Sequence, residues 1–115
     1  MRVIAGSHRG RRLCGPQGTV LRPTSDKVRA ALFSILGTQV SECRFLDLYA
    51  GTGAVGIEAL SRGASTVTFV ESDPMAVHLL QKNLRTCQLL DRARVHAVKT
   101  ADFLEREDWW GASYD

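Results

Sequence analysis

Two acidic side chains stand close to a glycine-rich segment, one within a short apolar run and the other directly after one. Asp47 lies within the run that begins at Phe45, and Glu71 directly follows the run at residues 66–70. Between them, residues 51–56 read G-T-G-A-V-G. In nucleotide-binding α/β units an acid about 20 residues after such a loop accepts hydrogen bonds from ribose hydroxyls. This spacing predicts a site for a nucleoside-containing cofactor, although an ordinary strand–turn–helix with a solvated glutamate is the alternative.

The position of Asp47 bears on which nucleoside would bind. The glycine segment satisfies G-x-G-x-x-G, which also fits a dinucleotide site, so a half-domain of an NAD-type oxidoreductase is one alternative. An acid before the glycines would sit close to a bound pyrophosphate and repel it. The same acid suits a cationic ligand, such as the amino group and sulfonium of S-adenosylmethionine. We therefore expect S-adenosylmethionine rather than a dinucleotide.

The elements that must position these residues follow from the apolar pattern. A buried strand before residue 48, a glycine turn and a helix from about residue 55 make the first unit. A second strand at 66–70, a helix from about 74 to 84 and a third strand at 95–98 continue the alternation. Strands that alternate with helices indicate a parallel sheet. The fold class we expect is α/β and Rossmann-like, with three parallel strands and their helices.

Composition excludes several classes of protein. The chain has 115 residues, of which 44% are hydrophobic and 23% charged, as in ordinary globular domains. No stretch approaches the ~18 apolar residues of a membrane span, and the first residues lack the apolar core of a signal peptide. Cys14, Cys43 and Cys87 are widely spaced without a C-x-x-C pair. We expect reduced thiols in a cytoplasmic protein, no metal site and no membrane partner.

The N-terminal third is strongly basic. Residues 1–40 hold seven basic side chains and one acid, whereas residues 41–115 hold eight basic and eleven acidic ones. Such asymmetry indicates a polyanionic partner, and Arg9, Arg11 and Arg12 could grip phosphates. Val3, Ile4 and Leu13 could form a short hairpin. A solvated tail is the alternative for the arm, and a non-enzymatic RNA-binding module is an alternative for the chain.

A helix follows the arm. Thr24 or Ser25 is a suitable N-cap, and Gly37 would end the helix. Its apolar positions recur at helical spacing, so we expect them to face the core; they are Val28, Ala31, Leu32, Ile35 and Leu36.

Several strings carry a family resemblance. D-L-Y-A-G-T-G at residues 47–53 and F-V-E-S-D at 69–73 look like the first and second motifs of class I methyltransferases. The string R-P-T-S-D-K-V-R-A-A-L-F-S-I-L at 22–36, with R-G-R-R at 9–12, resembles the RsmD family. These are bacterial-type enzymes that methylate a guanine N2 of small-subunit (16S) ribosomal RNA. The resemblance extends from the first residue to the last, and the Arg-Pro-Thr segment is its most specific part.

The resemblance implies roles for particular residues. Asp102 would accept from the adenine amino group with Phe103 near the ring, although Asp102 could instead cap a short helix at Phe103–Arg106. Arg22 and Thr24 would lie near the cofactor and the target base. The residues expected at the cofactor are Asp47, Ala50, Gly51, Thr52, Gly53, Glu71, Ser72, Asp102 and Phe103, and those expected at RNA are Arg9, Arg11, Arg12, Arg22 and Thr24.

The resemblance also divides the chain and suggests what is missing from it. We expect a basic RNA-binding arm at residues 1–21 and the N-terminal part of a methyltransferase domain at 22–115. Tyr114 and Asp115 look like the start of a fourth strand, which in the family ends in an Asp/Asn-Pro-Pro-Tyr/Phe motif absent from this sequence. We therefore expect no catalytic residue here and no turnover by this chain alone. The full-length enzyme would be a monomer, whereas this chain could self-associate through an open sheet edge.

Overall fold

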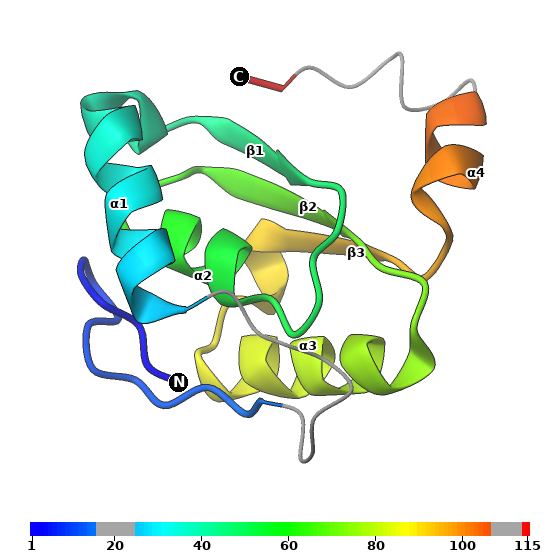
Figure 1. Cartoon of the computed structure of the whole chain (residues 1–115), viewed down its shortest axis with the longest axis horizontal. Coiled ribbons are helices and arrows are strands. Elements are labelled where there is room, and N and C mark those ends of the chain that lie inside the picture. Colours follow the sequence, from blue (N-terminus) through cyan, green and yellow to red (C-terminus); the bar gives the residue numbers. More distant parts are fainter. Residues whose placement is uncertain (16–24, 107–113) are drawn as a thin grey trace.

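The computed structural model describes residues 1–15, 25–106 and 114–115 and confirms an α/β fold built on a parallel sheet (Figure 1). The sheet has the order β1-β2-β3, formed by Arg44–Asp47, Thr66–Val70 and Ala93–His96. The strands are in parallel register, with Asp47 beside Phe69 and Phe69 beside Val95. The third strand begins two residues before the expected 95–98.

Helices α2 (Ala54–Ser61) and α3 (Pro74–Thr86) connect the strands and cross back over the same face of the sheet (Figure 1). Asp73 caps α3, accepting a bond from the Met75 N–H, and Pro74 occupies the first turn. The remaining elements are α1 (Asp26–Leu36), the short 3-10 helices η1 (Gly37–Val40) and η2 (Leu90–Arg92), and α4 (Thr100–Glu105). Among the described residues no helix is long and apolar enough to cross a bilayer.

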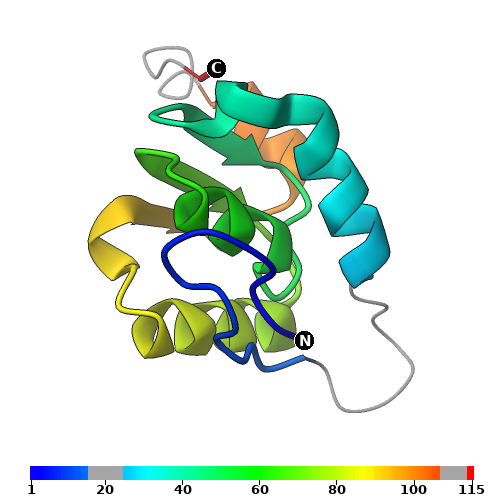
Figure 2. The same ribbon diagram turned by 90° about the vertical axis from the view of Figure 1, so that its left-hand side faces the viewer.

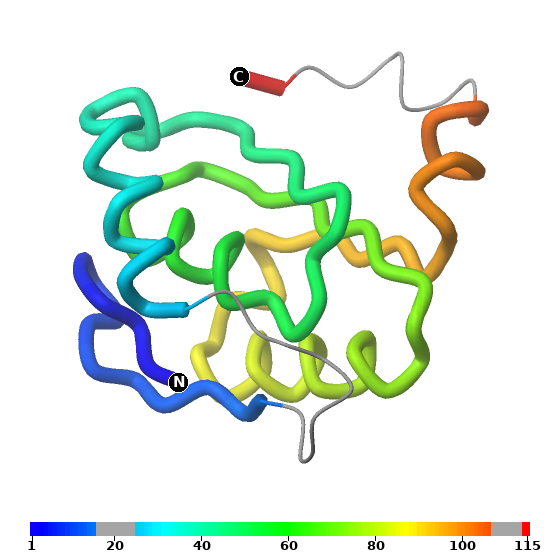
Figure 3. Tube along the Cα trace, in the orientation of Figure 1, coloured from blue at the N-terminus to red at the C-terminus, as the bar shows by residue number. Residues whose placement is uncertain are grey.

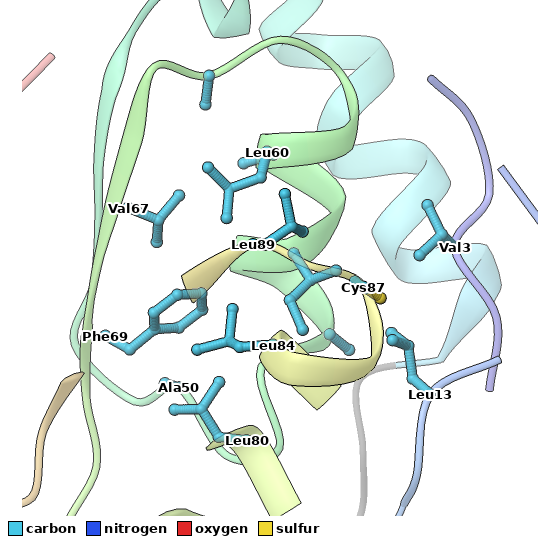
Figure 4. Packing of buried hydrophobic residues seen from close by; sticks show 14 of the residues in the cluster. Val3, Leu13, Ala50, Leu60, Val67, Phe69, Leu80, Leu84, Cys87 and Leu89 are labelled. Carbon is cyan, nitrogen blue, oxygen red and sulfur yellow. The ribbon is translucent and has the colours of Figure 1, made fainter. Parts of the chain in front are cut away.

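The core lies between the sheet and the helices α2 and α3 (Figure 4). The expected inward face of α3 is confirmed, because Ala76, Val77, Leu80 and Leu84 are all buried. Gly56 lets α2 approach β2 closely: a Cβ at this position would lie 2.2 Å from the Phe69 ring. No larger residue fits there without moving the helix away from the strand.

The expected inward face of α1 is wrong in part. Val28 and Ile35 are 57% and 82% exposed and Ala31 is exposed as well, while Arg29 and Phe33 are buried. Ser25 caps the helix, its hydroxyl accepting from the Val28 N–H at 3.2 Å. The helix packs its Phe33 against Phe45 of β1, with ring centroids 6.4 Å apart. The apolar positions of α1 form a wider face than the core covers, and a buried arginine takes part of the inner surface.

The N-terminal hairpin forms as expected and packs on α2 and α3 (Figure 2). Val3 and Leu13 are buried, and the Val3 N–H donates to the Arg11 carbonyl at 2.9 Å. Glu58 of α2 binds the hairpin: its carboxylate accepts from the N–H groups of Ile4 and Ala5 at 2.8 and 3.1 Å. The hairpin therefore shares the core of the domain.

Glu58 is fully buried, which its polar character alone did not suggest. It pairs with the equally buried Arg29 at 3.3 Å and with Arg62 at 2.8 Å. Arg29 also donates to the Arg2 carbonyl at 2.7 Å and to Asp26 at 2.6 Å. This network joins the hairpin to α1 and α2, and it explains why a charged pair is tolerated in the interior.

Strand β1 pairs with β2 on one side only. On its other side the Asp115 N–H donates to the Arg44 carbonyl at 2.8 Å, and the Arg44 N–H donates to the Asp115 carboxylate at 2.7 Å. Among the described residues, Asp115 alone forms hydrogen bonds with the backbone of β1 on that edge. Most of the backbone edge of β1 is therefore open to a further strand.

Candidate cofactor-binding site

The carboxyl ends of the three strands surround a hollow of about 310 Å³. Each strand contributes the residues that follow it, which is where ligands bind in open parallel sheets. The lining residues are Leu48, Tyr49, Glu71, Ser72, Lys99, Thr100 and Ala101. Thr100 links the start of α4 to the segment after β1, because its hydroxyl donates to the Leu48 carbonyl at 2.6 Å.

Glu71 fixes the glycine loop. One of its carboxylate oxygens accepts from the Gly51 N–H at 2.8 Å, and the other accepts from the Asp73 N–H at 2.9 Å. A carboxylate has about four lone-pair positions, so two remain for hydroxyl donors such as those of a ribose. A Cβ built at Gly51 meets nothing within 4 Å. There is thus open space directly above the loop, beside an acid with unused acceptor capacity.

Asp47 ends β1 below the same loop and is partly buried. Burial raises the pKa of its carboxyl from 3.8 to about 6; the Tyr49 N–H lowers it and the nearby Glu71 carboxylate raises it. Two acids therefore share this end of the sheet at a cost to the unliganded protein. A bound cation would offset the cost of burying the Asp47 carboxylate and its repulsion from Glu71. A pyrophosphate would instead add further repulsion.

Asn83 stabilises the glycine loop, a role that the apolar pattern of the sequence does not predict. It is buried on α3, and its amide donates to the Thr52 carbonyl of the glycine loop and the Cys14 carbonyl of the hairpin, both at 3.0 Å. Its oxygen accepts from the Cys14 N–H at 2.7 Å. A polar residue at a core-facing position between Leu80 and Leu84 was the available signal.

The structure brings most of the predicted cofactor residues together. Ala50, Gly51, Thr52 and Gly53 form the loop after β1, and Ala50 and Thr52 are buried beneath it. Ser72 is exposed and lines the hollow. These residues and Glu71 approach one another because parallel strands end at one edge.

Asp102 and Phe103 lie next to the hollow, in α4, rather than in its lining. Asp102 is exposed in the first turn of α4, next to Ala101 of the hollow, and Phe103 is buried with its ring 5.1 Å from that of His96. Neither lines the hollow itself. The alternative that Asp102 caps a helix at Phe103–Arg106 is wrong: α4 begins at Thr100, and Lys99 stands at its N-cap without a side-chain bond.

The predicted RNA residues that the structure describes do not line the hollow. Arg9, Arg11 and Arg12 are exposed on the hairpin. Arg22 and Thr24 fall outside the described residues.

A larger cavity, of about 420 Å³, lies beside the start and open edge of β1. It is lined by Leu36, Val40, Cys43 and Phe45, with polar neighbours that include Asp115. The smaller hollow is lined by Glu71 and Ser72 at the strand ends, and Glu71 is bonded to the glycine loop, whereas the larger cavity touches neither residue; we therefore assign the nucleoside to the smaller hollow. Within the described ranges no cluster of His, Cys, Asp or Glu could hold a metal ion.

Three parallel strands with a glycine loop after the first and an acid after the second define the N-terminal half of a class I methyltransferase fold. A SAM-dependent methyltransferase of Agrobacterium tumefaciens shares this fold at a TM-score of 0.63, with 24% identity over 76% of this chain and 29% of that one. A hypothetical protein of Thermus thermophilus superposes at a TM-score of 0.84, with 39% identity over 99% of this chain and 64% of that one.

The chain belongs to the family described as Conserved hypothetical protein 95, whose model matches residues 1–115. Ribosomal RNA small subunit methyltransferase D of Escherichia coli K12 is 41% identical over 93% of this chain and 54% of that protein. The RsmD resemblance is thus confirmed. The chain spans about half the length of the curated relatives that it matches.

Proposed function

We propose that this chain forms the cofactor-binding half of an S-adenosylmethionine-dependent methyltransferase that modifies a guanine N2 of small-subunit ribosomal RNA in the cytoplasm. The observation that carries the proposal is the pair of acids at the glycine loop, Asp47 and Glu71. Asp47 provides negative charge where a pyrophosphate would have to lie in a dinucleotide site, and Glu71 retains acceptor positions for ribose hydroxyls.

Each residue has a proposed task. Asp47 attracts the methionine amino group, Glu71 accepts from the ribose, and Gly51 to Gly53 let the loop approach the nucleoside. Ser72 lines the wall of the site, and Asp102 reaches the adenine amine from the start of α4. Phe103 does not stack on the base, because its ring is buried against His96. It packs α4, which carries Asp102, against β3.

The cofactor would supply an electrophilic methyl group. An exocyclic guanine amine is a weak nucleophile, so its lone pair must be oriented toward that methyl group. None of the residues placed at the hollow is suited to this task, and we propose that the orienting groups lie outside this chain. The exposed Arg9, Arg11 and Arg12 would bind RNA phosphates without contributing to the chemistry.

Calorimetric titration tests the cofactor assignment. S-adenosylhomocysteine and NAD are titrated separately into the chain, after circular dichroism has shown that it is folded. We expect S-adenosylhomocysteine to bind and NAD to bind at least about tenfold more weakly. Glu71→Ala should abolish binding, whereas Glu42→Ala, an exposed acid at the opposite end of β1, should not. Preferential binding of NAD would overturn the proposal in favour of an oxidoreductase half-domain.

A further inference from the structure

The solvent face of α3 is basic and continues the surface of the hairpin. Lys82 and Arg85 are exposed on α3, and Arg9, Arg11 and Arg12 are exposed on the hairpin. Residues 1–25 and 74–90 contain no acid at all. These five cations therefore lie on neighbouring elements whose segments contain no carboxylate.

The hairpin is fixed against α3 rather than merely near it. The His8 ring bonds to the Cys87 carbonyl at 2.9 Å, just beyond the last turn of α3. Asn83 and Cys14 exchange two hydrogen bonds of 2.7 and 3.0 Å. The trace in Figure 3 shows the second half of the hairpin, in blue, running beside α3. The charge of Arg11 also acts on the Cys87 thiol, where it opposes the rise in pKa caused by burial.

These cations are free for an external partner. In the described part of the chain Lys82, Arg85 and the three hairpin arginines form no ion pair, whereas Arg29, Arg44 and Arg62 each pair with a carboxylate. Cations at the end of a helix also favour the helix dipole, which gives Arg85 a local structural role. That role explains neither the unpaired Lys82 nor the unpaired arginines of the hairpin.

We propose that the solvent face of α3 binds RNA through Lys82 and Arg85. This face continues the proposed RNA-binding surface of the hairpin along the helix. The inference rests on the proposed function, since it takes RNA as the substrate. A 13-residue helix is about 20 Å long, so α3 and the hairpin together can contact several successive phosphates. The contacts are electrostatic and indifferent to sequence, and they position the RNA rather than select a base.

The test is fluorescence anisotropy with a labelled single-stranded RNA of about 20 nucleotides at several salt concentrations. Lys82→Gln/Arg85→Gln keeps good helix formers on α3 and removes two charges. We expect its affinity to fall about tenfold at about 50 mM salt. The slope of log K against log salt should become shallower by about 1.4, since each phosphate contact contributes about 0.7.

The matched control is Arg94→Gln/Arg106→Gln, which removes the same charge from exposed positions on β3 and after α4. It should leave the slope unchanged, and thermal melting should show both double variants to be folded. If the α3 variant binds like the control while Arg9→Gln/Arg11→Gln/Arg12→Gln loses affinity, RNA contacts only the hairpin and the proposal is wrong. It is also wrong if the unmodified chain does not bind RNA. Cofactor binding, measured separately by calorimetry, tests the proposed function independently of either result.

Discussion

Replacing Asp47 by asparagine should stabilise the unliganded protein while it destroys the cofactor site. The carboxyl of Asp47 has its pKa raised from 3.8 to about 6, mainly by burial. One pKa unit corresponds to about 1.4 kcal/mol, so the ionised carboxylate destabilises the fold by up to about 3 kcal/mol above about pH 6. Asparagine has nearly the same shape without the charge. We expect a gain of about 2–3 kcal/mol at about pH 7.5, allowing for residual solvent screening.

The sign of the effect makes it pH-dependent. Because the folded pKa is raised, the cost is absent below about pH 4, grows between about pH 4 and about pH 6, and is complete above that range. Urea unfolding followed by circular dichroism should show the full gain of Asp47→Asn at about pH 7.5 and about a third of it at about pH 4.5. The exposed Asp91→Asn is the charge-matched control and should change stability by less than about 0.5 kcal/mol at both. An equal gain at both pH values, or none, would refute the electrostatic argument.

Three further predictions follow from the packing. Glu58→Ala should cost about 3–5 kcal/mol in urea unfolding, because the buried Arg29 keeps only the exposed Asp26 as an ionic partner and the N–H groups of Ile4 and Ala5 lose their acceptor; a loss below about 1 kcal/mol would contradict the role of the network. Gly56→Ala should cost about 1–3 kcal/mol, since its Cβ would lie 2.2 Å from the Phe69 ring, and an unchanged denaturation midpoint would show that the helix can move away. The chain should self-associate through β1, and Leu46→Lys should shift it toward monomer in sedimentation velocity; a monomer at every concentration would exclude that edge as an interface.

The sequence predicts well those elements in which the apolar residues recur at the spacing of a single strand or helix. The strand at Thr66–Val70 and the inward residues of α3 both follow from apolar spacing. The site at the strand ends also follows, because the glycine loop and Glu71 are linked by topology rather than by detailed packing. The carboxyl ends of parallel strands meet at one edge of the sheet, and this does not depend on how the side chains in between pack.

The failures have a common physical origin. On α1, periodicity cannot distinguish the half of an apolar face that is covered from the half that is not, so Val28 and Ile35 were misplaced. Buried polar groups such as Glu58 and Asn83 depend on partners far away in sequence, namely Ile4, Arg29 and Cys14. No local pattern reports such a partner, although a polar residue at a core-facing position indicates that one exists.

The most direct test of the central claim is to locate the bound cofactor by NMR. S-adenosylhomocysteine is added to the ¹⁵N-labelled chain, and the amide chemical-shift changes are mapped onto the structure. We expect the largest changes at Gly51, Thr52, Gly53 and Glu71, with smaller ones near Asp102. Changes centred on Val40 and Phe45 beside the larger cavity, or no localised change in a folded sample, would contradict the assignment of the hollow at the strand ends.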